Sequence, residues 1–218
     1  MSIRVILADD HAIIRDGLRA LLAQKQEATV VGEAANGRAA VELARQHKPD
    51  LVILDVSMPD LNGIEAARQI HADVPTARIV ALSMHSDRRF VAEMLRAGAS
   101  GYLLKDCAFD EIHKAIETVL TGEIYLSSRI TGVLVDDYMK RMTDGETPGV
   151  AADISARERE VLQLLAEGKT TKQVALKLHL SPKTVETHRH NIMKKLNIDN
   201  IAELTKYAIR EGLTNVAD

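Results

Sequence analysis

A chain of 218 residues with 46% hydrophobic and 27% charged residues has the composition of a globular protein and the length of one large or two ordinary domains. Its apolar runs stay well below the roughly 20 residues that a membrane-spanning helix needs, and its N-terminus lacks the layout of a signal peptide. Its single cysteine excludes a disulfide within the chain. We therefore expect a cytoplasmic protein with no membrane partner.

The net charge of −3 is unevenly distributed along the chain. Residues 1–152 contain 17 Lys and Arg against 22 Asp and Glu, a net charge of −5. Residues 153–218 contain 11 against 9, a net charge of +2. The mildly basic C-terminal part hints at a polyanionic partner.

The first half of the chain alternates short apolar runs with segments of helical spacing. The runs begin near Ile3, Thr29, Leu51, Arg78 and Gly101. Short apolar runs bounded by polar residues are typical of buried strands, and their alternation with helices indicates βαβ units. Residues 1–121 are therefore predicted to form an α/β domain, a doubly wound five-stranded parallel sheet with the flavodoxin-like strand order 2-1-3-4-5.

Polar residues stand directly after four of these runs. They are Asp9 and Asp10 after the first run, Asp55 after the third, Ser83 after the fourth and Lys105 after the fifth. Because ligands of such sheets bind outside the carboxyl ends of the strands, we expect these side chains to meet. Three ionised carboxylates call for a cation, and hard oxygen ligands suit Mg²⁺. An aspartate beside Mg²⁺ can form an aspartyl phosphate, and the turn after Asp55 could lend the backbone carbonyl of Ser57 to the metal.

In this order, with Met58-Pro59 and Gly63 downstream of Asp55, the residues resemble the receiver domain of bacterial two-component response regulators. The resemblance implies that Asp55 is the phosphoacceptor and that a sensor histidine kinase donates the phosphate. The domain would catalyse only its own phosphorylation and dephosphorylation, so the protein is not expected to be an enzyme. The implied metal ligands are Asp9, Asp10, Asp55 and Ser57, and the implied phosphoryl contacts are Ser83 and Lys105.

By the same resemblance, Tyr102 is the aromatic residue that moves when Ser83 moves. A core aromatic residue with its hydroxyl at the surface explains Tyr102 as well. Both interpretations are left open by the sequence.

The alternation stops after Gly122, and residues 122–152 are predicted to form a linker that contains one helix near residues 127–141. Residues 143–149 are rich in turn formers. Residues 153–218 have helical patterns with clear start signals. Ser155 with Glu158 makes a capping box, and Ser181 before Pro182 is an N-cap followed by proline at the first helical position. Four short helices are expected there.

A short helix near residues 171–178, a turn, and a longer helix over residues 182–196 predict a helix-turn-helix. The longer helix carries four basic residues against one acidic residue, a local net charge of +3 that favours phosphates. Such a helix lies in the major groove of double-stranded DNA. The candidate DNA-contacting residues are Lys183, Thr184, Glu186, Thr187, Arg189, His190, Lys194 and Lys195.

Residues 155–213 resemble the LuxR/NarL-type output domain, on segments that include 157–162, 166–169 and 180–185. Many relatives carry a lysine where Glu186 stands, and residues 184–189 resemble the FixJ branch. Glu186 can accept a hydrogen bond from cytosine, or it can pair with Lys183 or Arg189. The sequence does not decide between these roles.

From end to end, the chain resembles a NarL/FixJ-type response regulator, a transcription regulator that Mg²⁺-dependent phosphorylation would switch. Phosphorylation would then promote a DNA-binding homodimer or free the output helices, and two-fold symmetry predicts paired half-sites, inverted or tandem, about one DNA turn apart. The last helix carries the candidate dimer face Ile201, Leu204 and Ala208, although packing within its own domain explains this stripe as well.

Two other classes were weighed against this interpretation. A phosphatase of the haloacid dehalogenase type would carry a second acid where Ser57 stands. A ligand-gated LuxR-type regulator would favour an aromatic-rich pocket. The chain has no Trp and only 3% aromatic residues, which disfavours the ligand-gated regulator, and Ser57 in place of the acid disfavours the phosphatase. The stimulus, the cognate kinase and the target genes leave no signal in the sequence.

Overall fold

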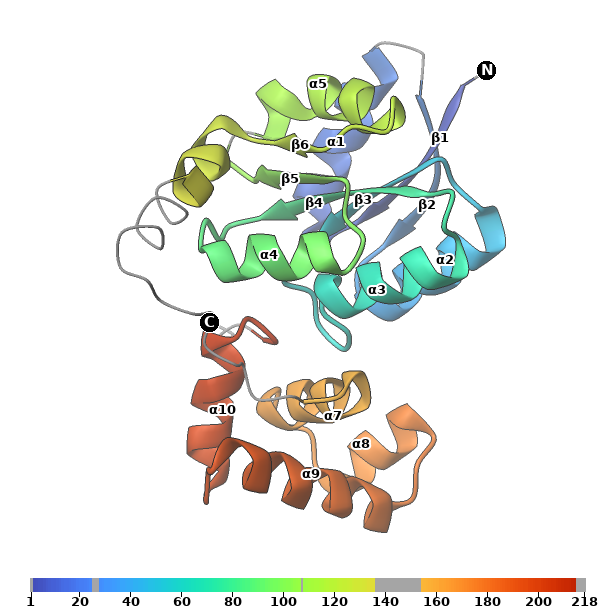
Figure 1. The fold of residues 1–218 in the computed structure, drawn as a ribbon. Coiled ribbons are helices and arrows are strands. Elements are labelled where there is room, and N and C mark those ends of the chain that lie inside the picture. Colours follow the sequence, from blue (N-terminus) through green and yellow to red (C-terminus); the bar gives the residue numbers. More distant parts are fainter. Residues whose placement is uncertain (1, 25–27, 107, 136–153, 215–218) are drawn as a thin grey trace. The chain divides into compact units, whose positions relative to one another are not determined.

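The computed structural model describes residues 2–24, 28–106, 108–135 and 154–214 (Figure 1). They belong to two compact units, Met1–Glu146 and Thr147–Asp218. Within the described residues, no helix has the length and apolar character to cross a membrane.

The first unit is built on a parallel β-sheet. Its strands are β1 (Ile3–Ala8), β2 (Ala28–Ala34), β3 (Leu51–Asp55), β4 (Arg78–Ser83), β5 (Gly101–Leu104) and β6 (Tyr125–Leu126). The strand order is β2-β1-β3-β4-β5-β6, which confirms the predicted order of the first five strands. The predicted number of five strands was wrong, because β6 adds to β5 with Gly101 opposite Tyr125. A two-residue strand is too short to leave a periodic signal in the sequence.

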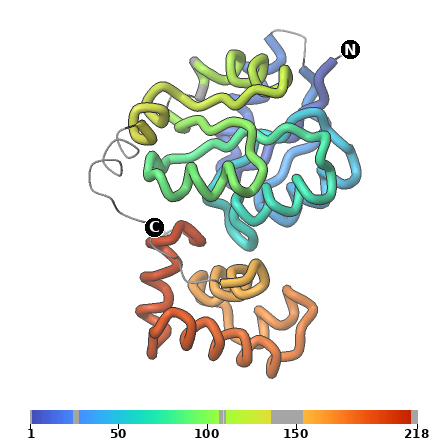
Figure 2. Tube along the Cα trace, viewed as in Figure 1, coloured from blue at the N-terminus to red at the C-terminus, as the bar shows by residue number. Residues whose placement is uncertain are grey.

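Helices cover both faces of this sheet. They are α1 (Ala12–Gln24), α2 (Gly37–His47), α3 (Gly63–Asp73), α4 (Arg88–Arg96) and α5 (Ala108–Leu120). Helices α1 and α5 lie on one face, and α2, α3 and α4 lie on the other (Figures 1 and 2). The central strand β3 is buried along its whole length, since each face packs against its own apolar cluster. This explains why its sequence is a continuous apolar run.

The first unit extends beyond residue 121. Residues 128–135 are helical, and Ile130 of this helix is fully buried in the same apolar cluster as Tyr102. The N–H of Ser127 donates a hydrogen bond to the carbonyl of Tyr102 at 3.1 Å. The first part of the predicted linker therefore packs onto strand β5. The remainder of the predicted helix and the turn-rich residues 143–149 lie outside the described residues.

The second unit contains α7 (Ala156–Ala166), α8 (Thr171–Leu178), α9 (Pro182–Leu196) and α10 (Ile201–Arg210). The predicted start signals of α7 and α9 are confirmed. Ser155 and Glu158 form both bonds of the capping box, and the side chain of Ser181 accepts a hydrogen bond from the N–H of Thr184. Inward-facing apolar residues from all four helices, among them Val161, Val174, Val185, Ile192 and Leu204, form one core. This core fixes α9 against α8 and exposes its opposite face.

Candidate phosphorylation site and nucleic-acid interface

Strands β1 and β3 are neighbours at the centre of the sheet, and the acids that follow them come together at its edge. Asp9 and Asp55 are each only 1% exposed. The ammonium Nζ of Lys105, at the end of β5, lies 2.7 Å from Asp9 Oδ2 and 2.9 Å from Asp55 Oδ2. Three residues from three strands therefore make one buried ion-pair cluster, in the place that the sheet topology predicts.

The ligand atoms of Asp9, Asp10, His11 and Asp55 all lie within 4.8 Å of one another. The imidazole Nδ1 of His11 is 3.1 Å from Asp9 Oδ1 and 2.8 Å from Asp10 Oδ1. His11 was not among the predicted site residues, although its position directly after the acidic pair is a usable signal. Three carboxylates, two of them buried, are a donor set that fits a hard divalent cation such as Mg²⁺.

Burial and, to a smaller extent, the negative charge of Asp9 raise the pKa of Asp55, Lys105 and the Ser57 N–H lower it, and the net result is a pKa of about 7. Burial lowers the pKa of Lys105, but the charges and hydrogen bonds of Asp55 and Asp9 outweigh it, so the net direction is upward. The single positive charge of Lys105 therefore does not fully offset burial and the negative charge of Asp9 at Asp55. A second cation would stabilise the ionised form of Asp55.

The loop after Asp55 is shaped by close backbone contacts. The N–H of Ser57 donates to Asp55 Oδ1 at 3.2 Å, and the N–H of Gly63 donates to the carbonyl of Val56 at 2.8 Å. A Cβ on Gly63 would lie 2.0 Å from the carbonyl oxygen of Asp55, so only glycine fits there. The structure thus places Ser57 beside Asp55, while a metal-binding role of its carbonyl stays a prediction.

Ser83 and Tyr102 lie in neighbouring strands next to this cluster. Ser83 is fully buried, and its hydroxyl oxygen accepts a hydrogen bond from the N–H of His85 at 2.9 Å. The hydroxyl of Tyr102 donates to the carbonyl of His85 at 2.8 Å. Tyr102 is fully buried, and this burial raises its pKa to about 12. Both side chains therefore hold the same loop, at His85.

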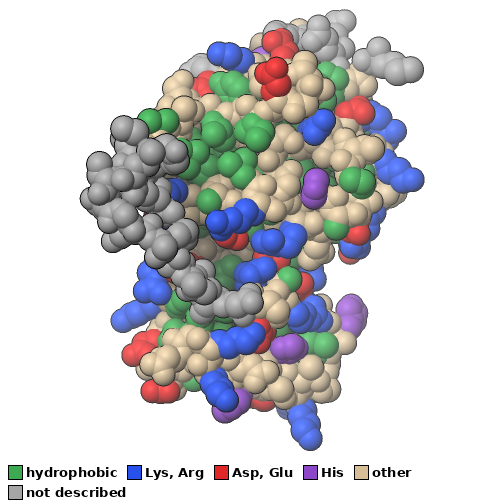
Figure 3. All heavy atoms as spheres, in the orientation of Figure 1, with side chains coloured by type: hydrophobic (Ala, Val, Ile, Leu, Met, Phe, Trp, Pro, Cys, Tyr) green, Lys and Arg blue, Asp and Glu red, His purple; other side chains and the backbone are tan. Residues whose placement is uncertain are grey.

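The outer face of α9 is a continuous stripe of exposed side chains. They recur at helical spacing and are Lys183, Glu186, Thr187, His190, Asn191 and Lys194. Asn191 stands four residues after Thr187 on this stripe and was not among the predicted DNA-contacting residues. An asparagine can bind adenine through two hydrogen bonds in the major groove. Figure 3 shows Lys and Arg side chains over the visible surface of the helical unit.

The candidates on α9 outside this stripe also have partners within the protein. The hydroxyl of Thr184 lies 2.8 Å from that of Ser181, at the start of the helix. The ammonium of Lys195 binds the nearly buried carboxylate of Glu158 at 2.7 Å. Arg189 pairs with Glu186, as one of the open alternatives expected. Lys195 therefore joins the end of α9 to the start of α7.

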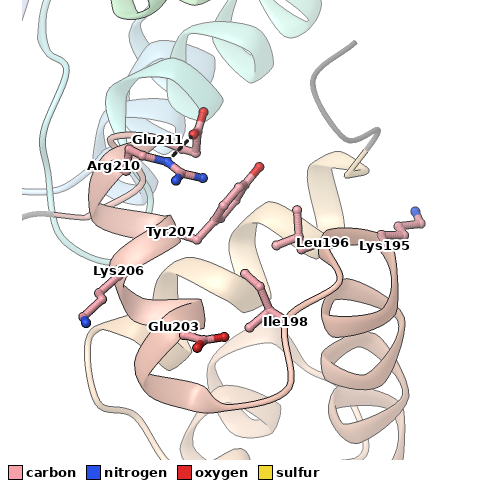
Figure 4. Close-up of a pocket in the computed structure, with 8 residues that line it drawn as sticks. All are labelled: Lys195, Leu196, Ile198, Glu203, Lys206, Tyr207, Arg210 and Glu211. Atoms are coloured by element: carbon pink, nitrogen blue, oxygen red, sulfur yellow. Dashed lines mark hydrogen bonds and ion pairs between the residues drawn. The ribbon is translucent and has the colours of Figure 1, made fainter. Parts of the chain in front are cut away.

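A groove lies between the end of α9 and helix α10 (Figure 4). Leu196, Ile198 and Tyr207 line it together with charged residues of both helices. The guanidinium carbon of Arg210 lies 5.3 Å from the ring centre of Tyr207. Of the predicted stripe on α10, Leu204 and Ala208 are fully buried. Packing within the domain therefore explains most of that stripe.

Comparison with known proteins assigns both units to protein families. Residues 5–117 match the family model for the response regulator receiver domain, and residues 152–208 match bacterial regulatory proteins of the luxR family. The transcriptional regulatory protein MctR of Rhizobium johnstonii is 38% identical over 214 residues, which are 98% of this chain and 96% of the relative.

Solved structures lead to the same family. The RcsB response regulator of Salmonella typhimurium aligns with a TM-score of 0.65 and 29% identity, over 94% of this chain and 96% of that one. The complex of RcsB with DNA aligns with a TM-score of 0.59 and 28% identity, over 95% and 98%. The chain therefore belongs to the two-component response regulators with a LuxR-type DNA-binding domain.

Proposed function

We propose that a sensor histidine kinase transfers a phosphoryl group to Asp55, in the presence of Mg²⁺, and that this modification controls DNA binding by the helical unit. The observation that carries the proposal is the contact of Lys105 with Asp9 and Asp55 at 2.7 and 2.9 Å. A buried acid beside an ammonium is suited to accept a phosphoryl group, because the positive charge of Lys105 offsets part of the phosphoryl charge.

Each residue of the cluster has a role in this proposal. A carboxylate oxygen of Asp55 attacks the phosphorus atom, and the histidine nitrogen of the kinase leaves. Lys105 supplies positive charge to the phosphoryl oxygens, and the Ser83 hydroxyl donates a hydrogen bond to one of them. Asp9, Asp10 and the Ser57 carbonyl would hold Mg²⁺, which supplies charge neutralisation when bound. Tyr102 would respond to Ser83 through the loop at His85 that both side chains hold.

The acceptor is tested with acetyl phosphate and Mg²⁺ on the full chain, followed by intact-protein mass spectrometry. The wild type should gain the mass of one phosphoryl group, and Asp55→Asn should not. The control Asp16→Asn, an exposed acid on α1, should behave like the wild type. An adduct that forms equally in Asp55→Asn would remove Asp55 from its role.

For the helical unit, we propose that α9 enters the major groove and that side chains of its exposed stripe, together with the neighbouring Arg189, face the bases and phosphates. The stripe and the likeness to a response regulator solved with DNA support this proposal. We also propose an activated homodimer on inverted or tandem half-sites about one DNA turn apart. Analytical ultracentrifugation with and without acetyl phosphate tests the dimer, and a monomer in both conditions would contradict it.

We keep residues 153–218 as the proposed DNA-binding domain and residues 122–152 as the proposed connection. The first part of that connection packs on β5, the strand that carries Tyr102. A change at the phosphorylation edge would therefore reach the connection through direct backbone contacts.

A further inference from the structure

Glu186 is held at both of its carboxylate oxygens. The hydroxyl of Thr171 donates a hydrogen bond to Oε1 at 2.6 Å, and Nη2 of Arg189 lies 3.2 Å from Oε2. Thr171 is the first residue of α8, whereas Glu186 and Arg189 are three residues apart on α9. The three side chains therefore form a chain of contacts that joins the two helices of the helix-turn-helix.

This arrangement leaves the guanidinium of Arg189 with donors to spare. An arginine has five N–H donors in a planar fork, and a single acceptor contact occupies few of them. The side chain of Arg189 is 43% exposed, so part of it is accessible to a ligand. Two acceptors, O6 and N7 of guanine, match such a fork in the major groove.

The contacts of Glu186 also bear on the alternative that it reads cytosine itself. Turning its carboxylate toward a base would break the bond to Thr171 and separate the charge from Arg189. A carboxylate without its cation would then approach the DNA phosphates, which repel it. The contact between Glu186 and Arg189 is an exposed ion pair, so it adds little to folding stability. Its effect is instead to position the guanidinium of Arg189.

We propose that Arg189 reads a guanine in the target DNA and that Glu186, itself held by Thr171, is the positioning residue that aims it. The inference rests on the proposed function, since it requires α9 to enter the major groove. Holding the guanidinium before binding reduces the rotamer freedom that is lost on binding. Glu186 therefore acts on affinity through Arg189 and has no separate base preference of its own.

The experiment uses the full chain treated with acetyl phosphate and Mg²⁺, and DNA duplexes that this protein selects from a random library. Each guanine of the selected duplex is replaced in turn by 7-deazaguanine, which lacks the N7 acceptor, and the Kd is measured by fluorescence anisotropy. For the wild type, one replacement should weaken binding about tenfold. For Arg189→Ala, the unmodified duplex should bind about tenfold more weakly, and that replacement should have no further effect.

The variants of Glu186 separate positioning from reading. Glu186→Ala should weaken binding about threefold, and Glu186→Ala with Arg189→Ala should bind like Arg189→Ala alone. Thr171→Val should weaken DNA binding by about the same factor as Glu186→Ala. Thr171→Ser, which keeps the hydroxyl, should bind DNA like the wild type. The matched control Lys194→Ala should weaken binding while leaving the effect of 7-deazaguanine unchanged. Far-UV circular dichroism checks that each variant folds.

Three results would overturn the inference. One is a wild type that is indifferent to every 7-deazaguanine. Another is a double variant whose fold-increase in Kd equals the product of the fold-increases of Glu186→Ala and Arg189→Ala, because independent contacts contribute additively to the binding free energy. The third is a wild type that selects no sequence at all, which would contradict the proposed DNA readout together with the inference. The first two leave the proposed function intact, so the two failures are distinguishable.

Discussion

Asp55→Asn should stabilise the first unit against unfolding, and the gain should grow with pH. Asp55 is buried beside Asp9, and its pKa is raised to about 7 from its ordinary value of 3.8. An acid whose folded pKa is raised binds more protons in the folded state, so wild-type stability falls as pH rises from about 4 to about 7. Asparagine has a similar shape and no charge, and it escapes this loss.

The size of the effect follows from the pKa difference. About three pH units, at about 1.4 kcal/mol for each, give about 4 kcal/mol as the upper limit above pH 7. The loss of the Asp55 charge next to Lys105 is already contained in this net shift. Local relaxation of the buried site reduces it, and we expect an observed gain of about 2 kcal/mol at pH 8. Near pH 4 the gain should shrink to a few tenths of a kcal/mol.

The assay is urea unfolding in EDTA at several pH values, followed by circular dichroism, with hydrogen exchange of β3 peptides to assign the transition to the first unit. The control Asp16→Asn removes an exposed acid and should stay within about 0.5 kcal/mol of the wild type. Adding Mg²⁺ at pH 8 should stabilise the wild type more than Asp55→Asn. A gain that does not change with pH would refute the reasoning.

Three further outcomes are expected. Gly63→Ala should destabilise the first unit by about 2 kcal/mol or more in urea unfolding, because its Cβ would lie 2.0 Å from the Asp55 carbonyl oxygen; unchanged stability would contradict this close approach. Lys195→Ala should destabilise the second unit by about 1–3 kcal/mol, since it leaves the nearly buried Glu158 without its cation, and thermal unfolding measures this. Lys194→Ala should weaken binding to all DNA sequences and reduce the slope of log Kd against log salt concentration by about one. Anisotropy titrations over a range of salt concentrations measure this slope, and an unchanged slope would exclude a phosphate contact.

The sequence was sufficient for the features that depend on local pattern and general topology. The apolar runs marked β1 to β5, and the right-handed crossover rule gave their order. That order alone brings Asp9, Asp55 and Lys105 to one edge, where the structure has them in contact. The helix-turn-helix was equally visible, because its N-caps and its proline are local signals.

Other features depend on contacts between residues that are far apart in the chain. Strand β6 exists because it pairs with β5, and Ile130 is buried because its helix packs beside Tyr102. The bond between Lys195 and Glu158 joins residues 37 positions apart, so no local pattern predicts it.

By itself, the sequence determined which chemical groups the protein has and at which edge or helix they stand, because spacing along the chain fixes these. Only the tertiary structure decided how the groups are paired. Glu186 shows the difference: its charge was evident, but its contacts with Thr171 and Arg189 depend on how α8 packs against α9. Pairing of this kind follows from the three-dimensional packing of the core, in which the side chains of all four helices take part.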